Sequence, residues 1–274
     1  MMKVLRISVA VLFLITTAVF SFIYINELSD SKDSAPVITL ETDVLEVSVN
    51  ATEQDLLKGV TAFDKEDGDL TNEIIIESIS MFVKKGVCKI TYAVCDSKNH
   101  VTDITRKLVY TDYESPVFTL NRSLCFSLYE IVNIKNAIDV NDCFDGALNN
   151  SMIITSQNYS MATAGIFSVD AVVTNSKGDT VKLTLPIIVE ERSTSAPTIE
   201  LNEYLIYADK GAEIDFNANI AAATDYLGED ITDDVEIDAV AVDMNTEGMY
   251  TVHYYVSDSK GVRGHNTLIV IVGS

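Results

Sequence analysis

The stretch "ITYAVCDSKN", residues 90–99, joins an alternating run of residues to a short polar motif that the chain repeats. The last four letters return as "NSKG" at 175–178 and as "DSKG" at 258–261. Before each copy, apolar and polar residues alternate with period two, which predicts a strand with one buried face. Asp or Asn opens each motif and Asn or Gly closes it, residue types that suit the tight loop of a hairpin. The stretch therefore predicts a β-hairpin that occurs three times.

A proline-led segment begins each copy of a larger repeat. The segments "APVITL", "SPVFTL" and "APTIEL" contain Pro36, Pro116 and Pro197, at spacings of 80 and 81 residues. Several short strands with regular turn signals in each repeat predict an all-β chain of small antiparallel β-sandwiches. We expect three tandem domains, called the first, second and third repeats, over residues 36–114, 115–195 and 196–274.

An uncharged apolar run, residues 7–25, lies near the N-terminus and follows Lys3 and Arg6. As a helix it would be about 28 Å long, close to the thickness of the hydrocarbon layer of a bilayer. The run therefore predicts a transmembrane anchor between a cytoplasmic tail, residues 1–6, and a linker, residues 26–35. Because the basic residues precede the run, the anchor is expected to be single-pass in the cell membrane, with the N-terminus inside and the repeats extracellular.

A cleaved signal peptide is the alternative interpretation of the same run. The stretch Val19-Phe20-Ser21 contains small residues that are acceptable at a signal-peptide cleavage site. The apolar run continues beyond them to Ile25, which favours a retained anchor. Since the sequence ends at Ser274, directly after the last predicted strand, we expect the third repeat to be the exposed tip.

The charge balance limits the kinds of partner. The chain has 19 basic and 41 acidic residues, for a formal net charge of -22. Like charge slows the encounter with nucleic acid or anionic lipid and weakens the contact. We therefore expect no nucleic-acid partner, and a membrane contact only through the N-terminal helix.

An acidic loop recurs upstream of each hairpin. It reads "DKEDGDLTN" from Asp64, "DCFDGALNN" from Asp142 and "DYLGEDITD" from Asp225. With the proline-led start and the hairpin, these loops resemble the bacterial immunoglobulin-like (Ig-like) domain, which is found in tandem on surface proteins of Gram-positive bacteria and in certain pesticidal crystal proteins. The resemblance covers residues 35–274. It implies three tandem Ig-like sandwiches that act outside the cell as a non-enzymatic spacer or adhesive module.

The first acidic loop offers a candidate calcium site. Asp64, Asp67 and Asp69 are spaced so that several oxygens could converge on Ca²⁺, which takes six to eight oxygen ligands. An EF-hand has a Glu six residues after its loop glycine, but position 74 is Ile. The spacing is therefore not that of an EF-hand. The favoured interpretation is that Asp64, Asp142 and Asp225 cap their loops through hydrogen bonds to the local backbone.

The histidines do not suggest a catalytic site. We expect His100 and His265 in or beside hairpin turns and His253 on a solvent-facing strand position. Spread over the repeats, they are expected not to assemble one site. No phosphate-binding glycine loop, nucleophile elbow or zinc-spaced cluster occurs in the sequence.

The cysteines are interpreted from their positions on the predicted strands. Cys88 and Cys95 lie seven residues apart on one strand and point to opposite faces, so they are not expected to pair. Cys88 is expected in the core. Cys125 and Cys143 fall in the second repeat and could form a disulfide outside the cell.

Together these patterns predict a non-enzymatic bacterial cell-surface protein. We expect a membrane-anchored rod of Ig-like modules that acts in adhesion, display or spacing, with a protein or glycan partner. No catalytic residue and no cofactor are expected. The alternative is an extracellular module that binds carbohydrate or Ca²⁺, or the ectodomain of a sensor.

Overall fold

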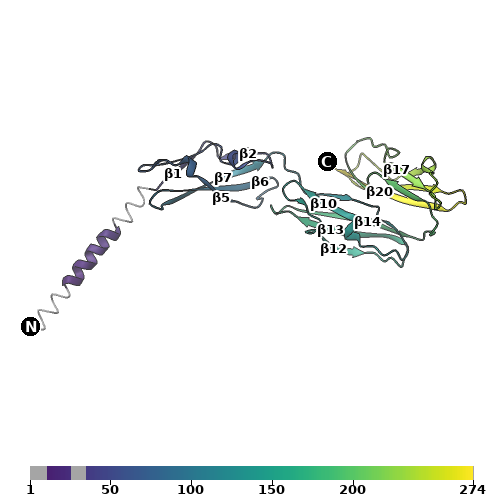
Figure 1. Cartoon of the computed structure of the whole chain (residues 1–274), viewed down its shortest axis with the longest axis horizontal. Helices are drawn as coiled ribbons and strands as arrows, with labels where there is room; N and C mark the ends of the chain where they lie inside the picture. Colours follow the sequence, from purple (N-terminus) through teal and green to yellow (C-terminus); the bar gives the residue numbers. More distant parts are fainter. Residues whose placement is uncertain (1–10, 26–34, 274) are drawn as a thin grey trace, which may run out of the picture. The chain divides into compact units, whose positions relative to one another are not determined.

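The computed structural model of the chain describes residues 11–25 and 35–273 (Figure 1). The chain divides into two compact units, Met1–Tyr113 and Glu114–Ser274. The first unit contains the first repeat, and the second unit contains the second and third repeats. The predicted cytoplasmic tail, residues 1–6, and most of the predicted linker lie outside the described residues.

A helix covers residues 11–25 within the predicted anchor, in purple in Figure 1. Its large hydrophobic side chains are exposed, with Val11 at 49% and Phe20 at 70% exposure. Within the residues that the structure describes, no helix is both long enough and apolar enough to cross a membrane. Residues 7–10 of the predicted anchor are not among them. The predicted transmembrane helix is therefore not confirmed.

The first repeat consists of two sheets and two short helices. The smaller sheet contains, in spatial order, β1 (Val37–Leu40), β3 (Val60–Asp64) and β4 (Gly68–Asp69). The larger sheet contains β2 (Val44–Val47), β7 (Val101–Tyr110), β6 (Val87–Cys95) and β5 (Ile75–Ile79). The short helices are α2 (Glu53–Leu56) and η1 (Thr71–Glu73).

The second repeat has the same two sheets. The smaller sheet contains, in spatial order, β11 (Gly146–Ala147), β10 (Ile138–Asp142) and β8 (Val117–Leu120). The larger sheet contains β12 (Ile153–Asn158), β13 (Gly165–Thr174), β14 (Thr180–Glu190) and β9 (Cys125–Ser127). A short helix, η2 (Ile134–Ala137), precedes β10.

In the third repeat, an isolated bridge between Thr224 and Asp230 replaces the third strand at the edge of the smaller sheet. The smaller sheet contains β15 (Thr198–Leu201) and β17 (Ile220–Thr224). The larger sheet contains, in spatial order, β16 (Leu205–Asp209), β20 (Arg263–Gly273), β19 (Gly248–Ser257) and β18 (Glu236–Asp238). The short helix η3 (Thr232–Asp234) follows β17. Among the described residues, no sheet runs from one repeat into the next.

The long hairpins confirm the prediction made from the alternating stretches. The strand pairs β6–β7, β13–β14 and β19–β20 are antiparallel and carry the recurring motif in their loops. In β6 the alternate residues Cys88, Ile90 and Tyr92 are fully buried, because the pleat turns them toward the smaller sheet. The residues that close the three motifs all have positive φ, at 68° for Asn99, 84° for Gly178 and 78° for Gly261.

The prediction of purely antiparallel sandwiches is wrong for one strand pair in each repeat. The first segment of every repeat breaks after four residues or so, as at Glu41–Asp43 in the first repeat. Its first half joins the smaller sheet, and its second half crosses to the larger sheet. There β2, β9 and β16 run parallel to β7, β14 and β20. The parallel direction follows because the crossing segment keeps its direction while it changes sheets.

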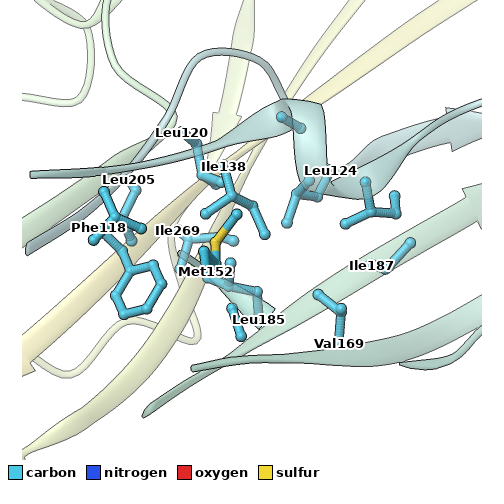
Figure 2. Packing of buried hydrophobic residues seen from close by; sticks show 14 of the residues in the cluster. Phe118, Leu120, Leu124, Ile138, Met152, Val169, Leu185, Ile187, Leu205 and Ile269 are labelled. Atoms are coloured by element: carbon cyan, nitrogen blue, oxygen red, sulfur yellow. The ribbon is translucent and has the colours of Figure 1, made fainter. Parts of the chain in front are cut away.

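The second and third repeats share part of one hydrophobic core (Figure 2). Leu205 on β16 and Ile269 on β20 belong to the third repeat and pair with each other in the parallel ladder. They pack in the same buried cluster as Phe118, Ile138 and Met152 of the second repeat. These two repeats therefore form a single compact unit.

Candidate functional site

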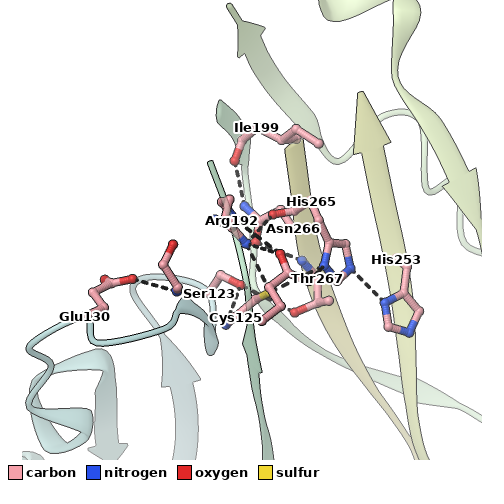
Figure 3. Close-up of polar contacts among 11 residues, drawn as sticks. Ser123, Cys125, Glu130, Arg192, Ile199, His253, His265, Asn266 and Thr267 are labelled. Atoms are coloured by element: carbon pink, nitrogen blue, oxygen red, sulfur yellow. Dashed lines mark hydrogen bonds and ion pairs between the residues drawn. The ribbon is translucent and has the colours of Figure 1, made fainter. Parts of the chain in front are cut away.

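Polar side chains of the second and third repeats meet where these repeats join (Figure 3). This junction cluster consists of Cys125, Glu190, Arg192, His253 and His265. Cys125 lies on β9, Glu190 ends β14, and the two histidines lie on β19 and β20. Arg192 follows β14 by two residues. The cluster thus draws its side chains from both repeats.

Strand register explains why these residues converge. In the parallel pair of β9 and β14, Cys125 lies opposite Ile188, so Glu190 is a diagonal neighbour of Cys125. In the hairpin of β19 and β20, His265 lies opposite Tyr255, so His253 is its diagonal neighbour. Diagonal neighbours on one face of a sheet are close enough for long side chains to touch.

His265 is the centre of the cluster. Its Nδ1 lies 2.7 Å from Oε2 of Glu190 and 3.5 Å from Sγ of Cys125. Its Nε2 lies 2.9 Å from Nδ1 of His253. Its side chain is only 9% exposed, and both ring nitrogens have partners inside the protein.

Arg192 fixes the orientation of its neighbours. Its Nε and Nη2 donate to Oε1 of Glu190 at 3.1 and 2.7 Å. Nη2 also donates to the main-chain oxygen of His265 at 2.9 Å and lies 3.3 Å from Sγ of Cys125. A single guanidinium therefore holds the end of β14 against β20 and leaves Oε2 of Glu190 facing His265.

Aromatic rings cover the histidine side of the cluster. The ring of Tyr255 stacks on His265 with centroids 4.6 Å apart, and the rings of His253 and His265 stack at 5.2 Å. The guanidinium carbon of Arg263 lies 3.7 Å from the centroid of Tyr255. These contacts shield the imidazoles from water and limit their rotation.

The environment shifts the pKa values of three groups in the cluster. Burial raises the pKa of the Cys125 thiol to about 12, and the negative charge of Glu190 acts in the same direction. Burial also opposes the ionisation of Glu190, but hydrogen bonds from His265 and Arg192 outweigh it and lower the pKa. Burial, aided by the neighbouring His265, lowers the pKa of His253. The thiol and His253 are therefore uncharged at neutral pH, and Glu190 is ionised.

The cluster brings three different metal-ligand types together. One ligand atom each from Cys125, Glu190 and His265 lies within 4.8 Å of the other two. Across the described ranges 11–25 and 35–273, this is the one group of three or more such residues that is compact enough to hold a metal ion.

The expectation that the histidines would not meet is wrong for His253 and His265. Both belong to the third repeat, and the hairpin brings them together. The sequence contained the signal, because a loop at residues 258–262 sets the register of the hairpin and places position 253 diagonal to position 265. His100 lies in the first unit, where its Nδ1 pairs with Oδ2 of Asp96 at 2.7 Å.

The three calcium candidates each bond to nearby groups of the first unit. Oδ1 of Asp64 accepts from the main-chain nitrogens of Glu66 and Asp67 at 2.7 and 2.9 Å. Asp67 accepts from the main-chain nitrogen and the hydroxyl of Ser97, both at 2.8 Å. Asp69 accepts from the main-chain nitrogen of Thr71 at 2.9 Å. The structure does not gather the three carboxylates into one metal-sized group, and calcium binding stays a prediction.

The predicted capping of the acidic loops is confirmed. Oδ1 of Asp142 accepts from the main-chain nitrogens two and three residues ahead at 2.9 and 3.0 Å. Oδ1 of Asp225 accepts from those two and four residues ahead at 2.8 and 2.9 Å. The loop glycines Gly68, Gly146 and Gly228 all have positive φ, as the tight turn requires.

None of the four cysteines, all of which lie in the described part of the chain, is in a disulfide. Cys88 is fully buried in the core, as predicted. Cys125 is buried on β9, and Cys143 is exposed with its Sγ 3.4 Å from the main-chain oxygen of Glu114. The disulfide considered between Cys125 and Cys143 is not formed.

The repeated two-sheet fold is consistent with Ig-like β-sandwiches, and a family model matches part of the third repeat. Residues 206–272 match the family model described as "Bacterial surface protein, Ig-like domain". The chain is also similar to the pesticidal crystal protein Cry22Aa of Bacillus thuringiensis, with 25% identity over 244 residues that cover 85% of this chain and 33% of that protein. The resemblance to bacterial Ig-like domains is thereby confirmed. The chain spans about a third of the length of this curated relative.

The chain also matches two solved structures at low similarity. One contains the M60 catalytic domain with the domains CBM51-1 and CBM51-2 of Clostridium perfringens ZmpB, at 15% identity, with 87% of this chain and 31% of that chain covered and a TM-score of 0.25. The other is the lipoprotein BT2262 of Bacteroides thetaiotaomicron, at 8% identity, with 58% of this chain and 81% of that chain covered and a TM-score of 0.24.

Proposed function

We propose that this chain is a non-enzymatic protein of the bacterial cell surface whose Ig-like repeats serve adhesion, display or spacing. The observation that carries the proposal is the match of residues 206–272 to an Ig-like domain family of bacterial surface proteins. The two preceding repeats have the same order of strands in two sheets, which supports one role for all three.

The chemistry of the junction cluster supports a structural role rather than a catalytic one. The raised pKa of Cys125 keeps its thiol protonated at neutral pH, whereas a nucleophilic cysteine needs its thiolate. The carboxylate of Glu190 is shared between Arg192 and His265. These contacts hold β14 and β20 together.

The N-terminal segment fits a membrane anchor in this proposal. Residues 7–25 contain no charged side chain and follow Lys3 and Arg6. The helix over residues 11–25 keeps its hydrophobic side chains exposed, which leaves them free to contact lipid. The basic residues before it would keep the N-terminus in the cytoplasm and the repeats outside.

The net charge limits the classes of partner that the chain could bind. A chain with a formal charge of -22 repels nucleic acid and anionic surfaces. A protein or glycan partner that is neutral or basic remains compatible with this charge. A binding screen of the full chain against glycans and host proteins distinguishes the two roles. Adhesion requires saturable binding to a partner, whereas spacing requires no partner.

Surface exposure is tested by protease treatment of intact bacteria that express the full chain with a tag after Gly273. We expect added protease to remove the tag from intact cells while a cytoplasmic marker survives. Deletion of residues 7–25 should leave the tag protected inside the cell, because the segment needed for export is lost. A tag in the full chain that becomes cleavable only after lysis would refute surface location.

A further inference from the structure

We propose that Cys125, Glu190 and His265 bind one divalent transition-metal ion, and that Zn²⁺ fits their donor atoms best. The three residues offer a sulfur, an oxygen and an imidazole nitrogen, the ligand types that Zn²⁺ takes in proteins. The side chains lie where the second and third repeats meet, and the inference is independent of the proposed surface function.

The spacing of the donor atoms is close to that of a zinc site. Ligand atoms around a tetrahedral Zn²⁺ lie about 3.3–3.8 Å apart, given metal–ligand bonds of about 2.0–2.3 Å. Sγ of Cys125 lies 3.5 Å from Nδ1 of His265, within that range. Oε2 of Glu190 lies 2.7 Å from the same nitrogen, a hydrogen-bond distance. An outward shift of this carboxylate oxygen by about half an ångström would complete three corners of a tetrahedron, with water at the fourth.

Neighbouring groups already orient the three ligands. A metal-bound histidine usually donates its second ring N–H to a partner that fixes its orientation. Nε2 of His265 lies 2.9 Å from Nδ1 of His253, which can accept that proton. Arg192 occupies Oε1 of Glu190, so that Oε2 faces Nδ1 of His265, the other ligand atom. Its guanidinium, 3.3 Å from Sγ, would stabilise the thiolate of Cys125 that a metal ion requires.

Metal binding would join the two repeats directly. Cys125 and Glu190 come from the second repeat and His265 from the third, so the ion would bridge β9 and β14 to β20. Binding to the folded protein alone raises its stability in proportion to the logarithm of the metal concentration. The metal would therefore stabilise the unit Glu114–Ser274 and leave the first repeat unaffected.

Cobalt titration of the full chain, in detergent and with the thiols reduced, tests the site. We expect Co²⁺ to produce a sulfur-to-cobalt charge-transfer band in the near ultraviolet that saturates at one equivalent and disappears when Zn²⁺ is added. The variants Cys125→Ser and His265→Gln should lose the band. The control variants Cys95→Ser and Cys143→Ser change exposed thiols elsewhere and should keep it.

A further variant keeps the test decisive if the ligand variants fail to fold. His253→Gln retains all three ligands and should weaken Co²⁺ binding about 10–100-fold while the band persists. Calorimetry of the unsubstituted chain should show that Zn²⁺ raises the unfolding temperature of one transition only. The absence of a charge-transfer band at saturating Co²⁺, or a band that survives in Cys125→Ser, would overturn the proposal.

Discussion

Single residues distinguish the acidic loops of the first two repeats. Oδ2 of Asp64 is buried and has no hydrogen-bond partner within the described parts of the chain. In the second repeat, the matching oxygen of Asp142 accepts from Nδ2 of Asn175 at 3.0 Å. The first repeat has Asp96 at the position of Asn175. Hydrogen bonds from main-chain nitrogens of its own loop hold the pKa of Asp64 below its usual value, although burial and the negative charge of Asp96 oppose its ionisation. An unsatisfied carboxylate in the first repeat thus corresponds to a satisfied one in the second.

Exchanging these residues should have opposite effects in the two units. Asp96→Asn supplies the missing donor and removes a like charge, so we expect the first unit to melt several degrees higher. Asn175→Asp removes the donor of a buried carboxylate and should lower the free energy of unfolding of the second unit by about 1–3 kcal/mol. Differential scanning calorimetry of both variants measures the shifts. A lower melting temperature for Asp96→Asn would mean that its pair with His100 outweighs the new bond.

Residue-level prediction succeeded where the cause is local. The caps formed by Asp64, Asp142 and Asp225 bond to nitrogens two to four residues away, and turn chemistry predicts such bonds. The unsatisfied Oδ2 of Asp64 could not be predicted, because it depends on how the acidic loop meets a hairpin about 30 residues downstream. Asp67 and Ser97, which bond across the same contact, show this separation.

Gly264 allows a close backbone approach that no other residue permits. A Cβ at this position would clash with the main-chain oxygen of Pro197, at the start of the third repeat. We expect Gly264→Ala to lower the free energy of unfolding by about 1–3 kcal/mol, as overpacking does elsewhere. Gly273→Ala is a suitable control, since a Cβ there meets nothing within 4 Å. Equal denaturation midpoints for the two variants would contradict this account.

At the scale of elements, a buried arginine fastens α2 to the larger sheet of the first repeat. Arg106 on β7 is 3% exposed and donates to the main-chain oxygens of Leu56 and Lys58 at 3.1 and 2.8 Å. Its Nε donates to the hydroxyl of Tyr92 at 2.9 Å, and this hydroxyl donates to the oxygen of Leu56 at 2.6 Å. The side chains of Arg106 and Tyr92 thus hold the oxygens of Leu56 and Lys58 against the larger sheet.

Loss of the arginine side chain should destabilise the first unit. Arg106→Ala removes the side-chain donor to the main-chain oxygen of Lys58, leaves that of Leu56 with the hydroxyl of Tyr92, and opens a cavity. We therefore expect the free energy of unfolding to fall by about 2–4 kcal/mol. Lys107→Ala, at an exposed position on the same strand, should change it by less than about 0.5 kcal/mol. Urea denaturation followed by circular dichroism compares the two variants. Similar losses for both would argue against the anchoring role.

Elements were predictable to the extent that their partners are near in sequence. The hairpins follow from alternation and turn residues, which need only a local pattern. The parallel pairs join residues more than 60 positions apart, such as Val44 and Lys107. Nothing within the short strand β2 indicates which edge it will extend or in which direction.

On the scale of the whole molecule, the chain should unfold in two steps. The first unit buries hydrophobic residues such as Ile90 and Leu108, whereas the second and third repeats share the cluster that contains Leu205 and Ile269. Leu205→Ala should lower the free energy of unfolding of the larger unit by about 2–5 kcal/mol and spare the first. Leu45→Ala, at a buried position of the first repeat, should do the reverse. Calorimetry should resolve the two transitions, and three independent ones would contradict the shared core.

The repeats in the sequence make the architecture predictable. The junction between the second and third repeats could not be predicted in the same way. Three proline-led segments and three hairpins are enough to count the repeats. The shared core and the junction cluster depend on side chains such as Leu205 and His265, which look like ordinary strand residues in the sequence. Their contacts arise only once the neighbouring repeat is in place.

The strand that crosses between sheets has a mechanical consequence. In every repeat it lies parallel to the strand that closes the repeat. The N-terminal end of the crossing strand and the C-terminal end of the closing strand therefore lie at opposite ends of the pair. Tension between the two termini of a repeat would act along this pair in shear, so that all its hydrogen bonds bear the load at once. An antiparallel pair pulled from one end would instead unzip bond by bond, which makes the observed arrangement the better one for a tether under force.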